Sequence, residues 1–256
     1  MTQAAFVHHV DLNCDLGEGA PNDAALMPLI TSANIAAGGH AGDEATIHAT
    51  VALARFYGVA VGAHPGFEDR AHFGRRELDL APELIRAMVA RQVSAVRTAC
   101  ADAGVKLAHV KPHGGLYTLA VRDAMVAAAV VGGVVDAVGR GMRLYAPPAG
   151  ELFLATGEAG LLPVAEVFAD RTYQPDGRLT PRSRPDALIT DVGAAVAQVL
   201  GMLRHGMVRS TEGDVVPIRA ETVCVHGDGA HAVEFATGLR AALASAGVRI
   251  CPPGSW

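Results

Sequence analysis

Titratable and polar side chains stand near the carboxyl ends of six short apolar segments of this sequence. At such positions a carboxylate, an imidazole or an ammonium group can exchange protons or stabilise a developing negative charge. The candidates are Asp11, Asn13 and Asp15 with Glu18 close behind, His40, His64, Lys111 with His113, Glu166, and His226 with Asp228. If these segments are parallel strands of one barrel, their carboxyl ends meet at one face and form a single site.

Lys111 and Glu166 are charged residues within otherwise apolar segments. Lysine and glutamate are rarely fully buried unless they are paired, and an unpaired charge in an apolar strand is costly. The sequence therefore predicts an ion pair between Lys111 and Glu166. Pro112 ends backbone hydrogen-bond donation after the lysine, and the two glycines after His113 would let the backbone approach a ligand closely.

Some of these polar residues have a structural alternative. Asp43 and Asp228 stand where they could cap the helices that follow them. His109 lies one layer deeper than Lys111, where the pattern fits a hydrogen-bonded core histidine as well as a site residue. Both alternatives stay open from the sequence.

Two long segments, 65–81 and 169–190, carry clusters of arginine. They exceed the usual length of connections between helices and strands, which predicts functional loops. The guanidinium group matches carboxylate and phosphate oxygens, so arginine clusters in an acidic chain indicate anion recognition. Arg171 and Arg182 are the candidates in the second loop, and ordinary solvent-exposed arginines are the alternative.

Seven apolar segments that alternate with helical patterns must position these residues. The predicted strands are 8–13, 32–38, 59–64, 106–111, 142–146, 163–168 and 221–226. Apolar residues at helical spacing predict helices at 82–104, 191–205 and 230–246. The alternation implies parallel strands, and seven units favour a seven-stranded parallel β/α barrel, with an open doubly wound sheet as the alternative. Because no linker divides the chain, we expect one domain over residues 1–256.

The alternation of side chains along a strand predicts which residues face the barrel interior. Asp11, Asn13 and Asp15 share one face of the first strand, and the apolar residues between them take the other. Small residues precede His40 and His64 on the presumed inward faces of their strands. They stand at positions 36, 38, 60 and 62, and they predict a cavity at the barrel mouth.

The composition favours a globular enzyme. Hydrophobic residues make up 50% of the 256 and charged residues 18%, which suits a large core. The net charge of −5 argues against binding to nucleic acid or to an anionic membrane, and no apolar run has the length of a transmembrane helix. Four scattered cysteines and an N-terminal segment unlike a signal peptide predict a cytoplasmic protein. The sequence contains no GxxxxGK[ST] phosphate loop and no cysteine-pair zinc site.

Six ordered motifs of the sequence resemble the LamB/YcsF family. They are DLNCDLGE at 11–18, NIAAGGHAGD at 34–43, GAHPGFEDRAHFGRR at 62–76, HVKPHGGLY at 109–117, EVFADRTYQPDGRLTPR at 166–182 and CVHGD at 224–228. The resemblance implies a seven-stranded β/α barrel related to glycoside hydrolases and polysaccharide deacetylases. It also implies the family's characterised role, the A subunit of an ATP-dependent 5-oxoprolinase, which opens the lactam ring of 5-oxoproline to glutamate with partner subunits B and C.

Opening a lactam requires an activated carbonyl group and a delivered water molecule. Phosphorylation of the carbonyl oxygen would activate it, which accounts for ATP as co-substrate. Because this chain lacks a phosphate loop, we expect it to open the ring while its partners activate the lactam. We expect Asp15, with His40 or His64, to deprotonate the water. We expect Lys111 and His113 to stabilise the oxyanion or phosphate, and Glu166 to hold Lys111 in place. The expected substrate-binding residues are Asp11, Asn13, His226, Asp228, and Arg171 or Arg182 for the substrate carboxylate.

Two departures from the family pattern lie at the predicted mouth. Ala37, Gly38 and Gly39 stand where the family usually has Cys-Gly-Phe, and the loop after DLGE is shorter than usual. Loss of a thiol and an aromatic ring would widen the pocket.

Two other functions stay open from the sequence. One is a stand-alone metal-dependent amidohydrolase or deacetylase, with Asp15, His40 and His64 as ligands of a divalent metal. The other is a non-catalytic subunit that binds a small anion.

Overall fold

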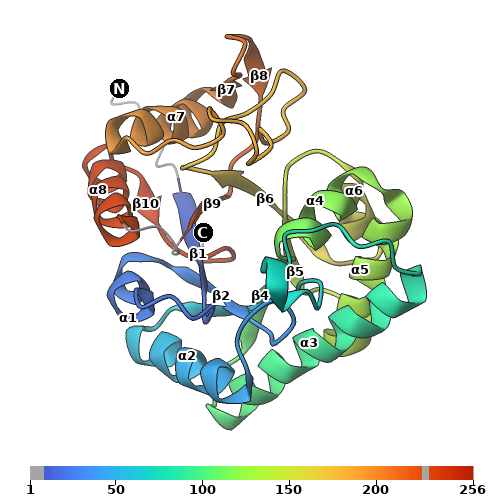
Figure 1. Cartoon of the computed structure of the whole chain (residues 1–256). Helices are drawn as coiled ribbons and strands as arrows, with labels where there is room; N and C mark the ends of the chain where they lie inside the picture. The colour runs from blue at the N-terminus through green and yellow to red at the C-terminus, as the bar shows by residue number, and fades with distance from the viewer. Residues whose placement is uncertain (1–8, 227–230, 256) are drawn as a thin grey trace, which may run out of the picture.

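The computed structural model describes residues 9–226 and 231–255 of the chain. Seven parallel strands form its centre. They are β1 (His9–Leu16), β2 (Ser32–Ala36), β3 (Ala60–His64), β4 (Leu107–Val110), β5 (Arg143–Ala146), β6 (Leu162–Phe168) and β9 (Thr222–Val225). The strands are neighbours in this order, and pairing of β9 with β1 closes the ring (Figure 1). The predicted seven-stranded parallel barrel is therefore confirmed.

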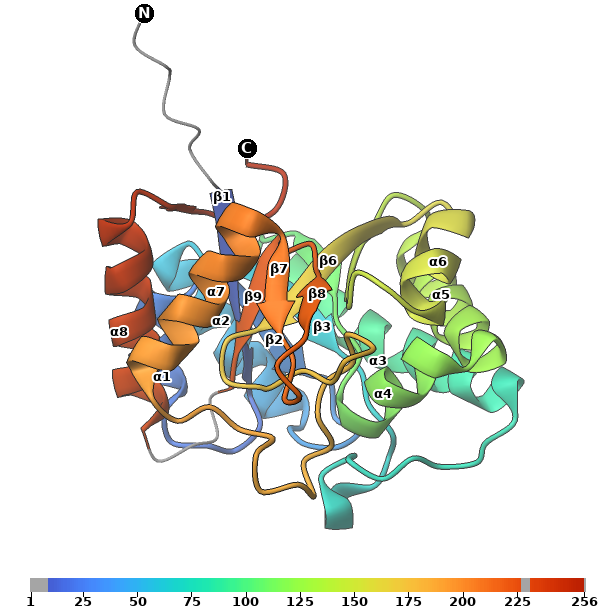
Figure 2. The ribbon, with the colours of Figure 1, turned by 90° about the horizontal axis from the view of Figure 1, so that it is seen from above.

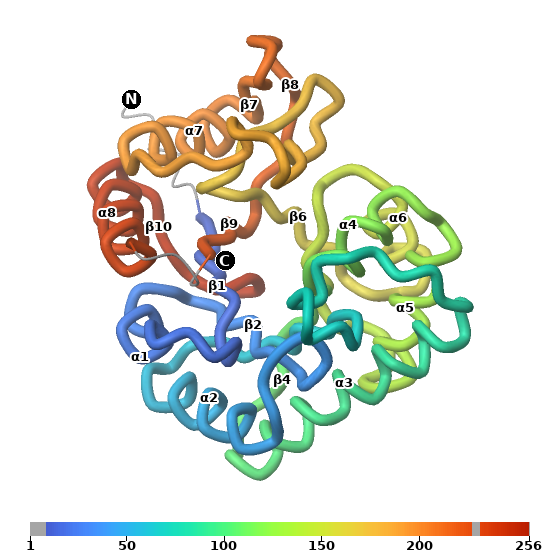
Figure 3. The backbone as a smooth tube through the Cα atoms, viewed as in Figure 1, coloured from blue at the N-terminus to red at the C-terminus, as the bar shows by residue number. Residues whose placement is uncertain are grey.

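Helices surround this ring of strands (Figure 1). They are α1 (Asp23–Leu26), α2 (Glu44–Tyr57), α3 (Pro82–Asp102), α4 (Gly114–Arg122), α5 (Ala124–Val138), α6 (Glu151–Glu158), α7 (Val192–His205) and α8 (Ala232–Ser245), with the short 3₁₀ helices η1 (Met27–Leu29) and η2 (Arg70–His72). The backbone trace passes around the barrel from β1 to α8 (Figure 3). Within the described residues, none of the helices combines the length and the apolar character needed to cross a lipid bilayer.

Two small additions to the barrel were not predicted. The antiparallel hairpin of β7 (Met207–Arg209) and β8 (Val215–Pro217) lies between α7 and β9, and β10 (Arg249–Ile250) pairs with the first residues of β1. Strands of two or three residues are too short to display the alternation on which a sequence prediction depends.

Local signals in the sequence set the helix boundaries. The side chain of Asp43 accepts a hydrogen bond from the backbone N–H of Thr46, so it caps α2, and Gly58 ends that helix in the left-handed conformation. Helix α3 begins at Pro82, as its fixed φ favours. The apolar residues of α3 that the helical spacing indicated are buried from Ile85 to Val96, whereas Leu84 is 60% exposed.

The two faces of β1 differ in chemistry as the alternation predicts. Val10, Leu12 and Cys14 belong to the hydrophobic core that the strands form with the helices. The side chains of Asp11 and Asn13 are fully buried and make hydrogen bonds to other strands of the barrel. A polar hydrogen-bonded network therefore fills the barrel interior and supports the residues at its carboxyl end.

The long segments 65–81 and 169–190 lie at the same end of the barrel (Figure 2). This is the end at which the parallel strands terminate, with His64 as the last residue of β3 and Phe168 as the last of β6. The predicted functional loops therefore border the predicted site.

Candidate active site

Asp11 forms the floor of the site. Its Oδ1 accepts hydrogen bonds from Thr31 (2.6 Å) and Ser32 (2.8 Å), and its Oδ2 accepts them from Thr222 (2.6 Å) and Tyr145 (3.0 Å). Burial raises the pKa of Asp11 above its ordinary value, although the four hydroxyl groups oppose this shift. Both oxygens are engaged inside the barrel, and the predicted substrate contact of Asp11 stays a prediction.

Lys111 lies in the layer above this floor, and its side chain is almost completely buried. Its Nζ lies 2.9 Å from Asp15 Oδ1 and 3.0 Å from Glu166 Oε1, so the expected partner of the lysine is present. It also donates to Cys224 Sγ (3.0 Å) and Asn13 Oδ1 (3.2 Å). Burial opposes the charged form, but Asp15, Cys224 and Glu166 together hold the pKa of Lys111 well above its ordinary value. The lysine therefore stays an ammonium ion.

Asn13 and Glu166 hold this ammonium group in place. Asn13 Nδ2 donates to Glu166 Oε1 (3.1 Å) and to Thr222 (2.7 Å), while its Oδ1 also accepts from Asn34 (2.7 Å). The second carboxylate oxygen of Glu166 accepts from the hydroxyl of Tyr117 (2.8 Å). Every polar atom of the Asn13 side chain thus has a partner within the barrel, and its predicted contact with substrate stays a prediction.

Asp15 joins the lysine to a group of histidines. Its Oδ1 accepts from Lys111 and from Asn34 Nδ2 (2.8 Å), and its Oδ2 lies 3.3 Å from His64 Nε2. Burial favours the protonated acid, yet His64 and Lys111 hold the pKa of Asp15 well below its ordinary value. Asp15 is therefore a carboxylate at the mouth of the barrel.

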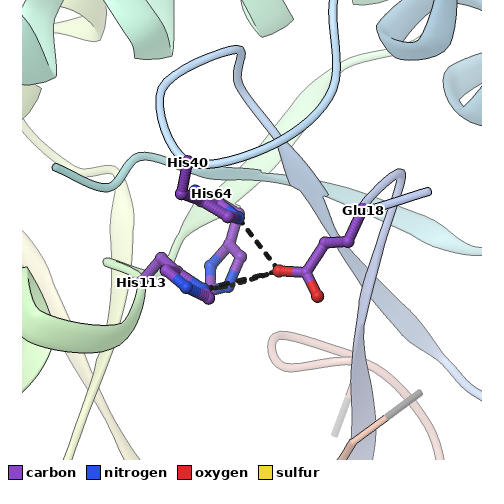
Figure 4. Close-up of side chains that lie close together, drawn as sticks. All are labelled: Glu18, His40, His64 and His113. Carbon is purple, nitrogen blue, oxygen red and sulfur yellow. Dashed lines mark hydrogen bonds and ion pairs between the residues drawn. The ribbon is translucent and has the colours of Figure 1, made fainter. Parts of the chain in front are cut away.

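Three histidines and Glu18 meet next to Asp15 (Figure 4), and we call these four residues the histidine cluster. Glu18 Oε1 lies 2.9 Å from His40 Nε2, 3.4 Å from His113 Nδ1 and 3.8 Å from His64 Nε2. His113 Nδ1 lies 3.0 Å from His64 Nε2, and the rings of His113 and His40 stack with centroids 3.6 Å apart. The four residues come from the carboxyl ends of the consecutive strands β1 to β4.

Backbone carbonyl groups fix two of these rings. His64 Nδ1 lies 2.7 Å from the carbonyl oxygen of Lys111, and His113 Nε2 lies 2.8 Å from that of Phe73. Because a carbonyl oxygen only accepts, both nitrogens must donate. The 65–81 loop approaches the rings closely at Gly74, where a Cβ atom would lie 2.6 Å from His40 Cβ, so only glycine fits there.

Burial changes the protonation of the cluster. It lowers the pKa of His40 to about 2, with His64 adding to the shift, and it lowers the pKa of His113 well below the ordinary value. Burial also disfavours charge on His64, but Asp15 outweighs it and raises the pKa of His64. His40 Nδ1 is buried and has no hydrogen-bond partner in the described part of the chain.

The remaining predicted residues lie at or beyond the rim. His226 Nδ1 pairs with Asp170 Oδ2 at 2.6 Å. The buried Arg171 donates to the carbonyl oxygens of Thr180 (2.6 Å) and Ala187 (3.3 Å), so it braces the 169–190 loop. Arg182 is exposed on the same loop. Asp228 lies outside the described residues, and its role stays a prediction.

The small residues near the strand ends differ in the space that they leave: a Cβ atom at Gly38 would meet nothing within 4 Å, whereas the space beside Gly62 is occupied. A Cβ atom at Gly62 would overlap the imidazole of His109, so the His109 ring occupies that room. A Cβ atom at Gly39 would lie 2.6 Å from Gln92 Nε2, because Gln92 bonds to both backbone groups of Gly66. Gln92 therefore occupies the space directly beside position 39, and the expected widening of the pocket stays a prediction.

Several contributors to the site were missed. Asn34 and Ser32 alternate along β2 as Asp11 and Asn13 do along β1, and this signal was available in the sequence. Tyr145 and Tyr117 reach the carboxylates from β5 and α4. Nothing in the spacing of these tyrosines distinguishes them from ordinary core aromatics, because their partners are distant in the sequence.

Comparison with known proteins agrees with this architecture. The LamB/YcsF family profile matches residues 10–256. The chain belongs to the LamB/YcsF family. It is 48% identical over 246 residues to the 5-oxoprolinase A subunit of Bordetella pertussis, covering 94% of this chain and 97% of that protein. It is 47% identical over 242 residues to the 5-oxoprolinase A subunit of Neisseria meningitidis serogroup B, covering 94% and 98%.

Solved structures show the same fold. The lactam utilization protein of Thermus thermophilus is 41% identical, with a TM-score of 0.89 over 95% of this chain and 99% of that chain. The structure described as T48 deacetylase with substrate is 14% identical, with a TM-score of 0.51 over 98% of this chain and 90% of that chain. The second likeness concerns the fold alone.

Proposed function

We propose that this LamB/YcsF chain is the A subunit of an ATP-dependent 5-oxoprolinase, which opens the lactam ring of 5-oxoproline to give glutamate. The observation that carries the proposal is the Lys111 ammonium group, buried between the Asp15 and Glu166 carboxylates at the barrel mouth. It occurs in a chain whose similarity to proteins named as the A subunit of 5-oxoprolinase extends over nearly their whole length.

Lys111 supports lactam opening through its charge. Attack of water on the lactam carbonyl carbon places negative charge on the carbonyl oxygen. If this oxygen already carries a phosphoryl group, the phosphoryl oxygens bear the negative charge and the electron pair of the C=N bond passes to the ring nitrogen. A preorganised ammonium in a site of low dielectric stabilises such charge strongly. Glu166 and Asn13 fix the position of Lys111, so it need not reorganise during the reaction.

Asp15 is the group that we assign to the attacking water. It orients the water and accepts its proton as the new C–O bond forms, and it returns this proton to the ring nitrogen when the C–N bond breaks. A carboxylate whose pKa is lowered is a weak base by itself. Activation of the water therefore requires a second group at the mouth, and the adjoining histidine cluster is placed to supply it.

The exposure of the loop arginines indicates which of them can contact the substrate. Arg182, exposed on the 169–190 loop, is the arginine that we assign to the substrate carboxylate, because the guanidinium of Arg171 is engaged by carbonyl groups. His226 pairs with Asp170, a residue of the same loop. Since the sequence has no phosphate loop, we assign ATP to the complex with partner subunits B and C, acting in the cytoplasm.

The test is a reconstitution with subunits B and C encoded by the same organism. We expect ATP hydrolysis that depends on 5-oxoproline, with release of glutamate, and loss of glutamate release when this chain is omitted. Inactivity of the full set on 5-oxoproline would contradict the proposal. Amide hydrolysis by this chain alone, without ATP, would instead support the stand-alone amidohydrolase.

A further inference from the structure

The histidine cluster contains nitrogen atoms whose protons are accounted for elsewhere. His64 Nδ1 donates to the carbonyl of Lys111, and His113 Nε2 donates to the carbonyl of Phe73. A metal ion binds the neutral form of imidazole, in which only one nitrogen carries a proton, so in that form His64 Nε2 and His113 Nδ1 both present lone pairs. These two atoms face each other at 3.0 Å.

Two facing lone pairs repel unless something positive lies between them or beside them. A carboxylate oxygen, Glu18 Oε1, approaches the same point and adds negative charge. His40 Nε2 completes the group from the other side of Glu18, at 2.9 Å. The four atoms form an electron-rich centre in a buried position, with side-chain exposures of 8% or less.

The spacing of the four atoms matches a metal site. In a tetrahedral zinc site with bonds of about 2.0–2.1 Å, ligand atoms lie about 3.3 Å apart. Glu18 Oε1 lies 2.9, 3.4 and 3.8 Å from the nearest nitrogens of the three histidines, and the nitrogens of His113 and His64 lie 3.0 Å apart. These distances fall on both sides of that value. All four atoms lie within 4.8 Å of one another. Small movements of the side chains would therefore complete the coordination.

We propose that Glu18, His40, His64 and His113 bind one divalent first-row transition-metal ion of the zinc type. Imidazole nitrogens with one carboxylate oxygen are ligands that such ions accept. The outward N–H groups of His64 and His113 already donate to backbone carbonyls, as the second ring nitrogen of a metal-bound histidine usually does. The ion links the ends of four consecutive strands beside Asp15.

A second group of possible ligands lies nearby, formed by Asp15, Cys224 and His226. The ammonium of Lys111 lies 2.9 Å from Asp15 and 3.0 Å from Cys224, so a positive charge already occupies this position. His226 Nδ1 is paired with Asp170. These contacts assign the ion to the histidine cluster instead.

The experiment uses the whole purified chain and reads metal binding directly, so its result does not depend on the proposed 5-oxoprolinase function. The chain is stripped with a chelator and titrated with Zn²⁺ against a chromophoric competitor, and with Co²⁺ in a visible-absorption measurement. We expect about one ion per chain, a rise of the unfolding temperature with Zn²⁺, and a cobalt spectrum without thiolate charge transfer.

Matched variants locate the site. Because loss of outer partners alone weakens metal binding about 10–100-fold, removal of a ligand in Glu18→Gln or His113→Ala should weaken it at least about 100-fold. His48→Gln, at an exposed histidine of α2, should bind as the wild type does. Failure of the wild type to bind Zn²⁺ or Co²⁺ would overturn the proposal and leave a proton between His64 and His113. Thiolate charge-transfer bands in the cobalt spectrum would overturn the proposal in favour of the group of Asp15, Cys224 and His226. The same holds if His226→Gln loses metal binding while Glu18→Gln and His113→Ala keep it.

Discussion

Lys111 keeps its charge in the barrel interior because the carboxylates of Asp15 and Glu166 lie within 3.0 Å of its ammonium group. This pair was predictable, since a charge in an apolar strand needs a partner. The hydroxyl groups that donate to Asp11 could not be predicted, because the register between strands distant in the sequence decides which side chains lie beside Asp11. The ion pair of Lys111 could therefore be predicted from residue types, whereas the hydrogen bonds around Asp11 required the three-dimensional structure.

His109 resolves one of the alternatives that the sequence left open. Its ring is buried, its Nε2 lies 2.8 Å from Asn34 Oδ1, and it stacks on Tyr145 with centroids 4.2 Å apart. It is a hydrogen-bonded core histidine beneath the site. Burial, with Lys111 and His64 adding positive charge nearby, lowers the pKa of His109 to about 3.

We predict that His109 contributes acid sensitivity. Below pH 6.5 the unfolded chain takes up a proton on this residue that the folded chain refuses until about pH 3, so the free energy of unfolding falls as pH decreases. The slope from one such group is about 1.4 kcal/mol per pH unit. His109→Gln keeps a donor for Asn34 without titrating, and urea unfolding from pH 6.5 to 4.5 should show a shallower slope than the wild type. Parallel slopes for the two proteins would contradict this account.

At the scale of elements, alternation of apolar strands and helical patterns sufficed to predict the barrel. The strand boundaries agreed closely, because parallel strands buried on both faces read as short apolar runs. Close packing between neighbouring strands was not visible in the same pattern. Glycine at position 62 indicated free space, whereas it accommodates the His109 ring of β4.

We predict that Gly62→Ala strains this contact between β3 and β4. The new Cβ atom would overlap the His109 imidazole, so the ring or the strand must move. Such overpacking should lower the free energy of unfolding by about 1–3 kcal/mol. Gly157→Ala in α6 is the matched control, because a Cβ atom there meets nothing within 4 Å, and it should stabilise by about 0.5 kcal/mol. Equal stability of the two variants in chemical denaturation would show that the contact is not tight.

At the scale of the whole molecule, the barrel brings the ends of strands from all parts of the chain to one mouth. Asp15 on β1 and Glu166 on β6 are distant in the sequence, yet both contact Lys111. The sequence predicted this convergence from the general rule for parallel barrels. The histidine cluster could not be predicted in detail, because the 65–81 loop orients His113 through a backbone carbonyl group.

The most direct test of the account compares the two lysines of the chain in the complex with subunits B and C. Lys111→Ala removes the buried ammonium, and Lys106→Ala removes an exposed one. We predict that Lys111→Ala assembles with its partners but releases glutamate at least about 100- to 1000-fold more slowly, the loss typical of one stabilising donor. Lys106→Ala should match the wild type. Glutamate release by Lys111→Ala at a rate close to that of the wild type would contradict the account.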